Sequence, residues 1–549
     1  MLGMGLCIET KESPLTKSEK PLFYGITTTV AVAVLFVTAM TRAVSPPAPP
    51  GAVYDRREAD WRNGAVVYQV IVDRFAPPAD LEAKRALYPP PKRLRPWSEP
   101  PARGQYNKQA GVWSHEIDFW GGDLNSLIGR LDYLTSDLGI DVLYLNPIHL
   151  AFTNHKYDAQ DYFEVSPEYG TRDDVRRLAE ALHQRGRRLV LDGVFNHMGR
   201  TSKWFQEAMA DPQNPRRNWF FIGPEYKLGY RAWYDVENLP ELRLEDETLR
   251  ARLFGDPDSV IQGYLREGVD GWRLDVAFDI GYEYLAEITR AAHQARPGSL
   301  VIGEVWNYPE YWLRSLDGVM NMVAREIIIR VAKGDLPAAL AGRHFERMVA
   351  DCGVEPLLKS WIILDNHDTV RLRNALPDSR QQKIAQVLQF TLPGSPCVYY
   401  GVEVGMEGGD DPEQRAPMRW DLVTTDNPYL QWTKRLLDMR RENRALRIGD
   451  FRLLDTSRLL AFQRMTNRAA DTMIIAANTG QSTESEILML RDSSLMSGTH
   501  FDDLLGGPEV RSFSGTLTLT LPPQSVVVLR PRVGTGPDYT PYKRAAVVK

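Results

Sequence analysis

Three carboxylates stand at or near the ends of short apolar segments of the sequence. Asp275 ends the run GWRLD, Glu304 lies within LVIGEVW, and Asp368 ends DNHD. Carboxyl groups serve as nucleophiles or as general acids and bases when a fold brings them to one site. The pattern therefore predicts a site in which several acidic side chains share the chemistry.

An arginine close to one of these carboxylates gives that group a distinct role. Arg273 lies two residues before Asp275 on a predicted strand, and the period of two puts both side chains on one face. A neighbouring cation keeps a carboxylate ionised, whereas burial or nearby negative charge keeps a second carboxyl group protonated. Retaining glycosidases need such a pair, one nucleophile and one acid, about 5–5.5 Å apart.

The segments that carry these residues belong to a series of eight apolar runs. Several are continuous rather than alternating, which is typical of parallel strands buried on both faces. Amphipathic stretches such as 173–187 lie between them. This order predicts an α/β fold, a (β/α)8 TIM barrel, with its active site at the C-terminal ends of the strands. The predicted strands are 66–72, 142–148, 188–195, 271–277, 300–306, 319–324, 360–366 and 397–405.

Two further regions depart from the barrel pattern. Residues 198–245, after the third strand, are rich in Trp, Tyr and Pro and predict a small inserted subdomain over the barrel mouth. The catalytic barrel is expected over 61–446, and short β runs separated by turn residues then predict a C-terminal all-β sandwich domain over 447–532. Residues 533–549 are expected to form a tail.

The N-terminal part of the chain resembles targeting sequence. After an N-terminal segment, 1–21, the stretch 22–40 carries no charge and is long enough to cross a bilayer. Residues 22–43 are therefore predicted to be a signal peptide or a membrane anchor, followed by a Pro-rich linker over 44–60. Both alternatives export the catalytic part, to the periplasm or the cell exterior. Only the second leaves it attached to a membrane.

Composition excludes some partners. The formal net charge is −5, and there is no basic excess of the kind that a nucleic-acid-binding protein shows, so no nucleic-acid partner is expected. The three cysteines form no CxxC pair, which argues against a zinc site or a disulfide framework. A single Cys352–Cys397 bridge stays open.

The motifs, taken in order, resemble those of the α-amylase family, glycoside hydrolase family 13. Segments 192–197, 271–276, 303–306 and 365–368 are similar to its four short motifs, and the resemblance covers roughly residues 60–530. Single motifs of this length occur by chance, but this ordered set does not. Further segments that agree are DRF at 73–75, GGDL at 121–124, NPI at 146–148, HKYDAQDY at 155–162 and DPEQRAPMRW at 411–420.

The resemblance implies roles for the acidic residues. Asp275 matches the nucleophile that forms a β-glycosyl-enzyme, and Glu304 matches the general acid/base. Asp368 matches the third carboxylate, which holds sugar hydroxyls and favours a distorted, oxocarbenium-like ring. Arg273 would hold Asp275, and Asp192 is expected to brace the site rather than to react.

Further residues are implied to bind an α-glucan or malto-oligosaccharide substrate. Tyr157 would stack on the glucose at the reaction centre, and His197 and His367 would donate to hydroxyls of that glucose. Asp411 and Arg415 would contact the next glucose on the non-reducing side.

Within the family, Trp306 after Glu304 resembles the neopullulanase and cyclomaltodextrinase branch. The segment LPELR at 239–243 departs from MPKLN, the usual form of that branch's fifth motif. Those enzymes typically carry an extra N-terminal β domain that builds their dimer. Here only targeting sequence and linker precede the first predicted strand, so we expect a monomer without that domain.

No cofactor is required for this chemistry, but calcium is an open alternative. Many α-amylases use the Asn of the first motif, here Asn196, as a calcium ligand. They also use a carbonyl four residues after the nucleophile, often within a Lys-His pair, where this chain has Phe278 and Asp279. Calcium takes six or more oxygen ligands, and Asn196 is the one side chain that the resemblance suggests.

The implied activity is retaining hydrolysis of α-1,4-glucosidic bonds in starch, maltodextrins or cyclodextrins, with α-1,6 bonds as a further substrate. One alternative is an α-glucan transglycosylase, in which a sugar rather than water attacks the same intermediate. An alternative of another class is a membrane-anchored, non-catalytic amylase-like transporter subunit. Such subunits tend to lose the carboxylates, and all three are present here.

Overall fold

The computed structural model describes residues 52–533. Its centre is a closed parallel barrel in which the strands follow one another in chain order. Each predicted barrel strand overlaps an observed one, so the (β/α)8 prediction is confirmed. The strands are β1 (Val67–Val70), β6 (Val142–Leu145), β9 (Arg188–Gly193), β10 (Gly271–Leu274), β11 (Leu300–Val305), β12 (Gly318–Asn321), β13 (Trp361–Ile362) and β14 (Ser395–Tyr399).

Continuous apolar runs form these strands because both faces are covered. The inner face packs on itself through side chains such as Val67, Tyr144, Ile302 and Trp361. The outer face packs against the surrounding helices within a second, larger cluster that includes Trp272. The observed strands are shorter than the predicted ones, since the polar loops that carry the site begin inside the predicted ranges.

The helices that surround the barrel start at polar caps. The amphipathic stretch predicted at 173–187 forms α4, where the Thr171 side chain accepts a hydrogen bond from the Asp174 N–H. The long barrel helices are α4 (Arg172–Gln184), α7 (Val260–Arg266), α9 (Tyr282–Ala295), α10 (Met322–Lys333), α11 (Ala338–Cys352), α14 (Ser379–Thr391) and α15 (Pro428–Glu442). Shorter helices are α2 (Val72–Phe75), α3 (Leu124–Ile128), α6 (Glu247–Arg250), α8 (Ala277–Ile280), α12 (Val354–Lys359), α13 (Leu372–Ala375) and α16 (Arg444–Ile448).

Two long connections build the walls of the barrel mouth. The segment after β9, predicted as an insertion, contains α5 (Lys203–Ala210) and isolated bridges such as His197 to Glu241. The connection between β1 and β6 is also long and has small sheets that the sequence reasoning did not assign. They are β2 (Arg93–Leu94) with β5 (Asp118–Phe119), and β3 (Tyr106–Asn107) with β4 (Val112–Trp113). A further pair, β7 (His149–Ala151) and β8 (Ala159–Val165), follows β6.

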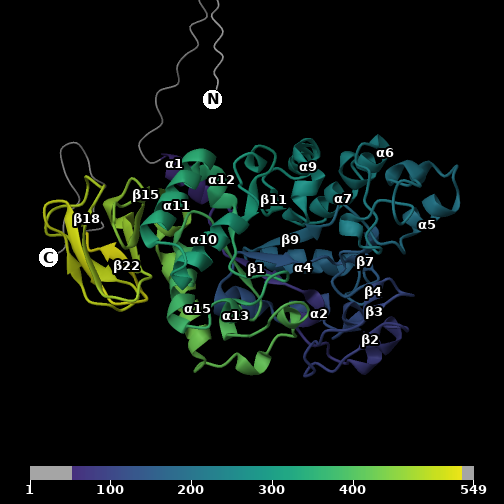
Figure 1. Cartoon of the computed structure of the whole chain (residues 1–549), viewed down its shortest axis with the longest axis horizontal. Helices are drawn as coiled ribbons and strands as arrows, with labels where there is room; N and C mark the ends of the chain where they lie inside the picture. Colours follow the sequence, from purple (N-terminus) through teal and green to yellow (C-terminus); the bar gives the residue numbers. More distant parts are fainter. Residues whose placement is uncertain (1–51, 534–549) are drawn as a thin grey trace, which may run out of the picture. The chain divides into compact units, whose positions relative to one another are not determined.

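The C-terminal part is all-β, as predicted (Figure 1, yellow). A six-stranded sheet and a two-stranded sheet enclose an apolar core that includes Leu454, Ile474, Leu488 and Leu517. The larger sheet has β15 (Asp450–Leu453), β16 (Leu460–Met465), β17 (Met473–Asn478), β22 (Ser525–Pro531), β19 (His500–Asp503) and β20 (Val510–Arg511). The smaller pairs β18 (Glu484–Met489) with β21 (Thr516–Leu521).

The segments predicted at 1–21 and 22–43, residues 44–51 of the predicted linker, and residues 534–549 of the predicted tail lie outside the described residues. The end of that linker range forms α1 (Ala52–Ala59), which Arg57 ties to Glu355 and Asp450. Between residues 52 and 533, no helix is long and apolar enough to cross a membrane. Export therefore stays a prediction. Cys352 and Cys397 are both free thiols, so the bridge left open by the sequence is absent.

Candidate active site

The C-terminal ends of the barrel strands open into a pocket of about 1070 Å³. Asp275 follows β10, Glu304 lies on β11, and Asp368 lies on the loop after β13. All three carboxylates line this pocket. The other predicted substrate-binding side chains in its lining are Tyr157, His197, His367, Asp411 and Arg415.

Arg273 is the fully buried cation that joins the carboxylates. Its Nη1 lies 2.7 Å from Asp192 Oδ1 and 2.9 Å from Asp275 Oδ1, and its Nη2 lies 2.9 Å from Glu304 Oε2. The expected contact with Asp275 is therefore one of three. Because one guanidinium spans several oxygens at once, it fixes the relative positions of these carboxylates as well as compensating their charge.

The backbone directly after Asp275 is strained in a way that serves Glu304. Val276 adopts φ 38° and ψ 47°, a left-handed conformation that is unfavourable for a β-branched residue. Its N–H donates to Glu304 Oε2 at 2.9 Å, and the indole N–H of Trp306 donates to Oε1 at 2.9 Å. The tight turn thus links the two carboxylates through the main chain.

Two of the three acidic groups have pKa values that their surroundings shift in opposite directions. Burial raises the pKa of Asp275 well above its ordinary range, Arg273 opposes this, and the negative charges of Glu304, Asp192 and Asp368 add to it. Burial also acts to raise the pKa of Asp368, but His367 and Arg415 outweigh it and lower that pKa below its ordinary range. Asp368 is therefore ionised.

His197 is a neutral hydrogen-bond donor that points into the pocket. Its Nδ1 lies 3.3 Å from the Asn196 side-chain amide nitrogen, which makes Nδ1 the acceptor and leaves the proton on Nε2. Nε2 lies 3.9 Å from Asp275 Oδ2 and has no hydrogen-bond partner among the described residues. Burial lowers the pKa of His197 to about 3, so the ring stays neutral. Such an unpaired buried donor suits a substrate hydroxyl.

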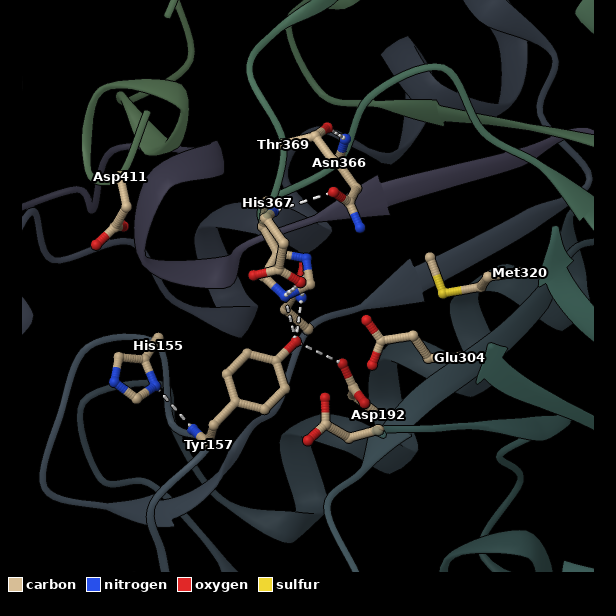
Figure 2. Close-up of polar contacts among 12 residues, drawn as sticks. His155, Tyr157, Asp192, Glu304, Met320, Asn366, His367, Thr369 and Asp411 are labelled. Carbon is tan, nitrogen blue, oxygen red and sulfur yellow. Dashed lines mark hydrogen bonds and ion pairs between the residues drawn. The ribbon is translucent and has the colours of Figure 1, made fainter. Parts of the chain in front are cut away.

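Tyr157 and His367 form a stacked pair at the floor of the pocket, with ring centroids 5.3 Å apart. Figure 2 shows the Tyr157 hydroxyl pointing toward both His367 and Asp192, at 2.6 Å from His367 Nε2 and 3.0 Å from Asp192 Oδ2. Gln69 and Asn146 present amide nitrogens to His367 Nδ1, which leaves Nε2 to donate. His367 Nε2 also contacts Asp368 Oδ2, at 3.0 Å.

Asp411 and Arg415 extend this network to one side. Arg415 Nη2 lies 3.2 Å from Asp368 Oδ1, and its Nη1 lies 3.1 Å from Asp411 Oδ1. Arg415 Nε and Gln414 Nε2 both donate to the His367 carbonyl, at 2.9 and 2.8 Å. The loop after β14 therefore holds the loop after β13 in place.

Sequence reasoning missed residues that line the pocket or bind residues of its lining. His115 donates to Asp411 Oδ2 at 3.0 Å through Nε2, because its Nδ1 accepts from the Gly104 N–H. Burial acts against ionisation of Asp411, but this hydrogen bond and Arg415 lower its pKa to about 2. Trp233 stacks on His197. These residues lie on the two long connections, away from strand ends, so no strand-based signal could have identified them.

The segment 239–243, which corresponds to the fifth motif, lies against the first motif, residues 192–197. Leu239 lines the pocket, and Glu241 pairs with His197 in an isolated β-bridge. The Glu241 carboxylate points instead to Arg231, at 2.5 Å. Glu241, one of the residues that depart from the usual motif, thus takes part in a backbone pairing and in an ion pair.

The surroundings of Asn196 supply little for calcium. Among residues 52–533, no group of three or more His, Cys, Asp and Glu side chains is placed to hold a metal ion. The Asn196 side-chain amide lies against His197, and the main-chain carbonyl oxygen of Asn196 accepts from the Leu242 N–H. A hard cation needs several more oxygens than these.

The fold and the site together define a class: a barrel enzyme whose pocket gathers three carboxyl groups from the strand ends. Residues 69–466 match the family described as "Alpha amylase, catalytic domain". The chain belongs to the α-amylase family and is a glycosidase of that family.

Its relatives agree with this assignment. Neopullulanase 2 of Thermoactinomyces vulgaris is 31% identical over 484 residues, covering 86% of this chain and 78% of the relative. Cyclomaltodextrinase of Geobacillus thermopakistaniensis is 33% identical, covering 85% of this chain and 77% of the relative. Among solved structures, the cyclic alpha-maltosyl-(1→6)-maltose hydrolase of Arthrobacter globiformis superposes with a TM-score of 0.71 at 26% identity. That match covers 86% of this chain and 99% of the hydrolase.

Proposed function

We propose that this enzyme hydrolyses α-1,4-glucosidic bonds of malto-oligosaccharides and starch-like glucans with retention of configuration. The observation that carries the proposal is the position of Asp275 and Glu304 on one guanidinium. A shared cation favours the short spacing of a retaining pair, about 5–5.5 Å, over the roughly 6.5–9.5 Å of inverting enzymes. The names of the relatives, neopullulanase and cyclomaltodextrinase, support an α-glucan substrate.

In the first step, ionised Asp275 attacks the anomeric carbon while Glu304 donates its proton to the leaving glycosidic oxygen. The C1–O bond breaks as a covalent bond to Asp275 forms. In the second step, Glu304 takes a proton from water, and the water oxygen replaces Asp275 at C1. The first step needs a proton on Glu304 and none on Asp275, whereas the second needs Glu304 without its proton so that it can act as the base.

The remaining residues hold the reacting glucose and its neighbour. Asp368 is ionised and accepts from sugar hydroxyls, while His197 and His367 donate to them. Tyr157 provides an aromatic face that His367 backs by stacking. Asp411 and Arg415 bind the next glucose on the non-reducing side, since their ion-pair network leads away from Asp368.

The test is Asp275→Asn, which keeps the shape of the site and removes the nucleophile. We expect this variant to lose turnover on starch, pullulan and β-cyclodextrin, as measured by chromatography of the products. Binding of malto-oligosaccharides should be retained. Proton NMR of the first wild-type product is expected to show the α-anomer. Near-wild-type turnover in Asp275→Asn would contradict the nucleophile, and a β-anomer would contradict retention.

A second candidate is transglycosylation through the same intermediate, and Trp306 favours it. The Trp306 side chain is 49% exposed, lines the pocket, and binds Glu304 through its indole N–H. An indole at this place can stack an acceptor sugar as it approaches the acid/base. Trp306→Ala is then expected to shift products at high maltotriose concentration from longer oligosaccharides to hydrolysis products. An unchanged product ratio would remove this candidate.

A further inference from the structure

The pocket has an end wall that none of the roles above uses. The hairpin formed by β3 and β4, residues 106–113, lines one side of the pocket, and residues 233–238 of the insertion line another. These two segments lie more than one hundred positions apart in the chain, yet they contact each other. The two segments are therefore linked to each other beside the pocket.

The contact consists of four residues, which we call the bridge: Tyr106, Ala110, Arg200 and Glu237. The Tyr106 hydroxyl donates to Glu237 Oε2 at 3.3 Å, and Glu237 pairs with Arg200. Arg200 Nη2 donates to the Ala110 carbonyl at 3.3 Å, which returns the link to the hairpin. The bridge thus joins the hairpin, the start of the insertion and its end.

The hairpin is shaped to receive Arg200. Gly111 in its turn has φ +70°, and a Cβ there would lie 2.7 Å from Arg200 Nη2. Glu237 is fixed from the other side, because its carbonyl accepts from the Tyr230 hydroxyl at 2.7 Å. Arg200 and Asn238 are also joined through the main chain. The bridge is therefore anchored at both ends by contacts of its own.

The position of the bridge defines which end of the substrate it faces. The hairpin continues directly into His115, which binds Asp411. Asp411 and Arg415 hold the second glucose on the non-reducing side in the proposed function. A third glucose on that side would meet the hairpin, where Tyr106 and Trp113 stand edge to face with ring centroids 5.8 Å apart.

We infer that the bridge limits the non-reducing side of the pocket to two glucose units, so that the enzyme attacks chain ends and releases maltose. This inference rests on the proposed function and specifies its substrate. The pocket volume of about 1070 Å³ has room for a short oligosaccharide. A cyclodextrin ring offers no chain end, so it is a poor substrate compared with linear malto-oligosaccharides.

The test follows the first cut in maltoheptaose labelled at its reducing end. For wild type we expect the label to appear first in maltopentaose, since maltose leaves from the non-reducing end. Tyr106→Ala removes the aromatic wall and Arg200→Ala removes both arms of the bridge. Each is expected to raise the share of internal cuts, and the rate on β-cyclodextrin relative to maltoheptaose, by about tenfold.

Tyr106→Phe is the matched control, because it keeps the ring in the wall and loses only the hydrogen bond to Glu237. Its cutting pattern is expected to stay close to wild type. Thermal melting shows which variants are folded. Tyr106 lines the pocket and Arg200 does not, so the two opened variants change different parts of the wall. One of them remains informative if the other fails to fold.

Three results separate the two proposals. Labels scattered over several products in wild type, or an unchanged pattern in folded Tyr106→Ala and Arg200→Ala, would overturn the role of the bridge while leaving hydrolysis intact. No cleavage of maltoheptaose by wild type would instead overturn the proposed function. A first cut to maltopentaose that spreads in the opened variants supports both.

Discussion

Replacing Arg273 by Met should move the acid limb of the pH profile upward. Arg273 Nη1 lies 2.9 Å from Asp275 Oδ1, so the charge centres are about 4 Å apart. At an effective dielectric constant of about 20, such a pair interacts by about 4 kcal/mol. Because one pKa unit corresponds to about 1.36 kcal/mol, the midpoint of the acid limb should rise by up to about 3 pH units.

The sign follows from the state that is needed for attack. Asp275 must be ionised, burial already raises its pKa, and Arg273 opposes that rise. Without the cation, ionisation needs a higher pH. The assay is kcat/KM for maltotriose across pH in wild type, Arg273→Met and Arg273→Lys. Lys keeps the charge but cannot span several carboxylates, so an intermediate profile is expected.

Arg273→Met should also lower the stability of the fold, and by more at higher pH. Removing one partner of a buried ion pair costs about 3–5 kcal/mol, and here three carboxylates lose their partner. A carboxyl group whose folded pKa is raised favours the folded state at low pH, and this contribution is lost as pH rises through that pKa. The melting-temperature gap between Arg273→Met and wild type should therefore widen from pH 4.5 to pH 8. An acid limb that coincides with wild type, together with a constant gap, would refute this reasoning.

Three further predictions concern neighbouring groups. Glu304→Gln should lower maltotriose hydrolysis by about 10²–10⁴-fold, because the leaving sugar loses its proton donor. Glycosylation by an activated aryl maltoside should be spared, since its leaving group needs no proton, and stopped-flow release of the aryl group measures this step. Equal losses on both substrates would contradict the acid role. His197→Ala should lower kcat/KM by roughly 10–150-fold, as expected for one hydrogen bond of about 1.5–3 kcal/mol to a charged or reacting group. The acid limb of the pH profile should not move, since burial holds the His197 pKa at about 3. A displaced acid limb would show that His197 titrates in the working range. Burial raises the pKa of the Cys397 thiol, so this thiol should react slowly with maleimide at pH 7.5. Peptide mass spectrometry of the labelled native protein should find Cys397 protected and Cys352 linked to no partner. Rapid modification of Cys397 would contradict its burial.

The barrel could be predicted from sequence because its signal is local. Strands buried on both faces appear as continuous apolar runs, and each of the eight predicted runs overlaps an observed strand. Their ends were less predictable: the run at 397–405 stops being a strand at Tyr399, because Gly401 adopts φ +87° and turns the chain. The residues placed around Asp275, Glu304 and Asp368 were predictable for the same reason, since strand ends meet at one mouth.

The walls of the pocket were not predictable in this way. His115 meets Asp411 across 296 positions, and nothing in the sequence near either residue signals the pairing. The hairpin 106–113 consists of two-residue strands, too short to produce an alternating pattern. The number of carboxylates on Arg273 was also hidden, since sequence spacing relates it to Asp275 but tertiary packing adds Asp192 and Glu304.

The support that Gln414 and Arg415 give to the His367 carbonyl has a consequence for synthesis of the chain. A nascent polypeptide that has emerged only as far as the end of β14 already contains Asp275, Glu304 and Asp368. It lacks the segment that fastens the loop bearing Asp368, so its third carboxylate has no fixed place. Sugar-cleaving competence therefore arises late in translation, after the last barrel strand has emerged and the segment behind it has docked.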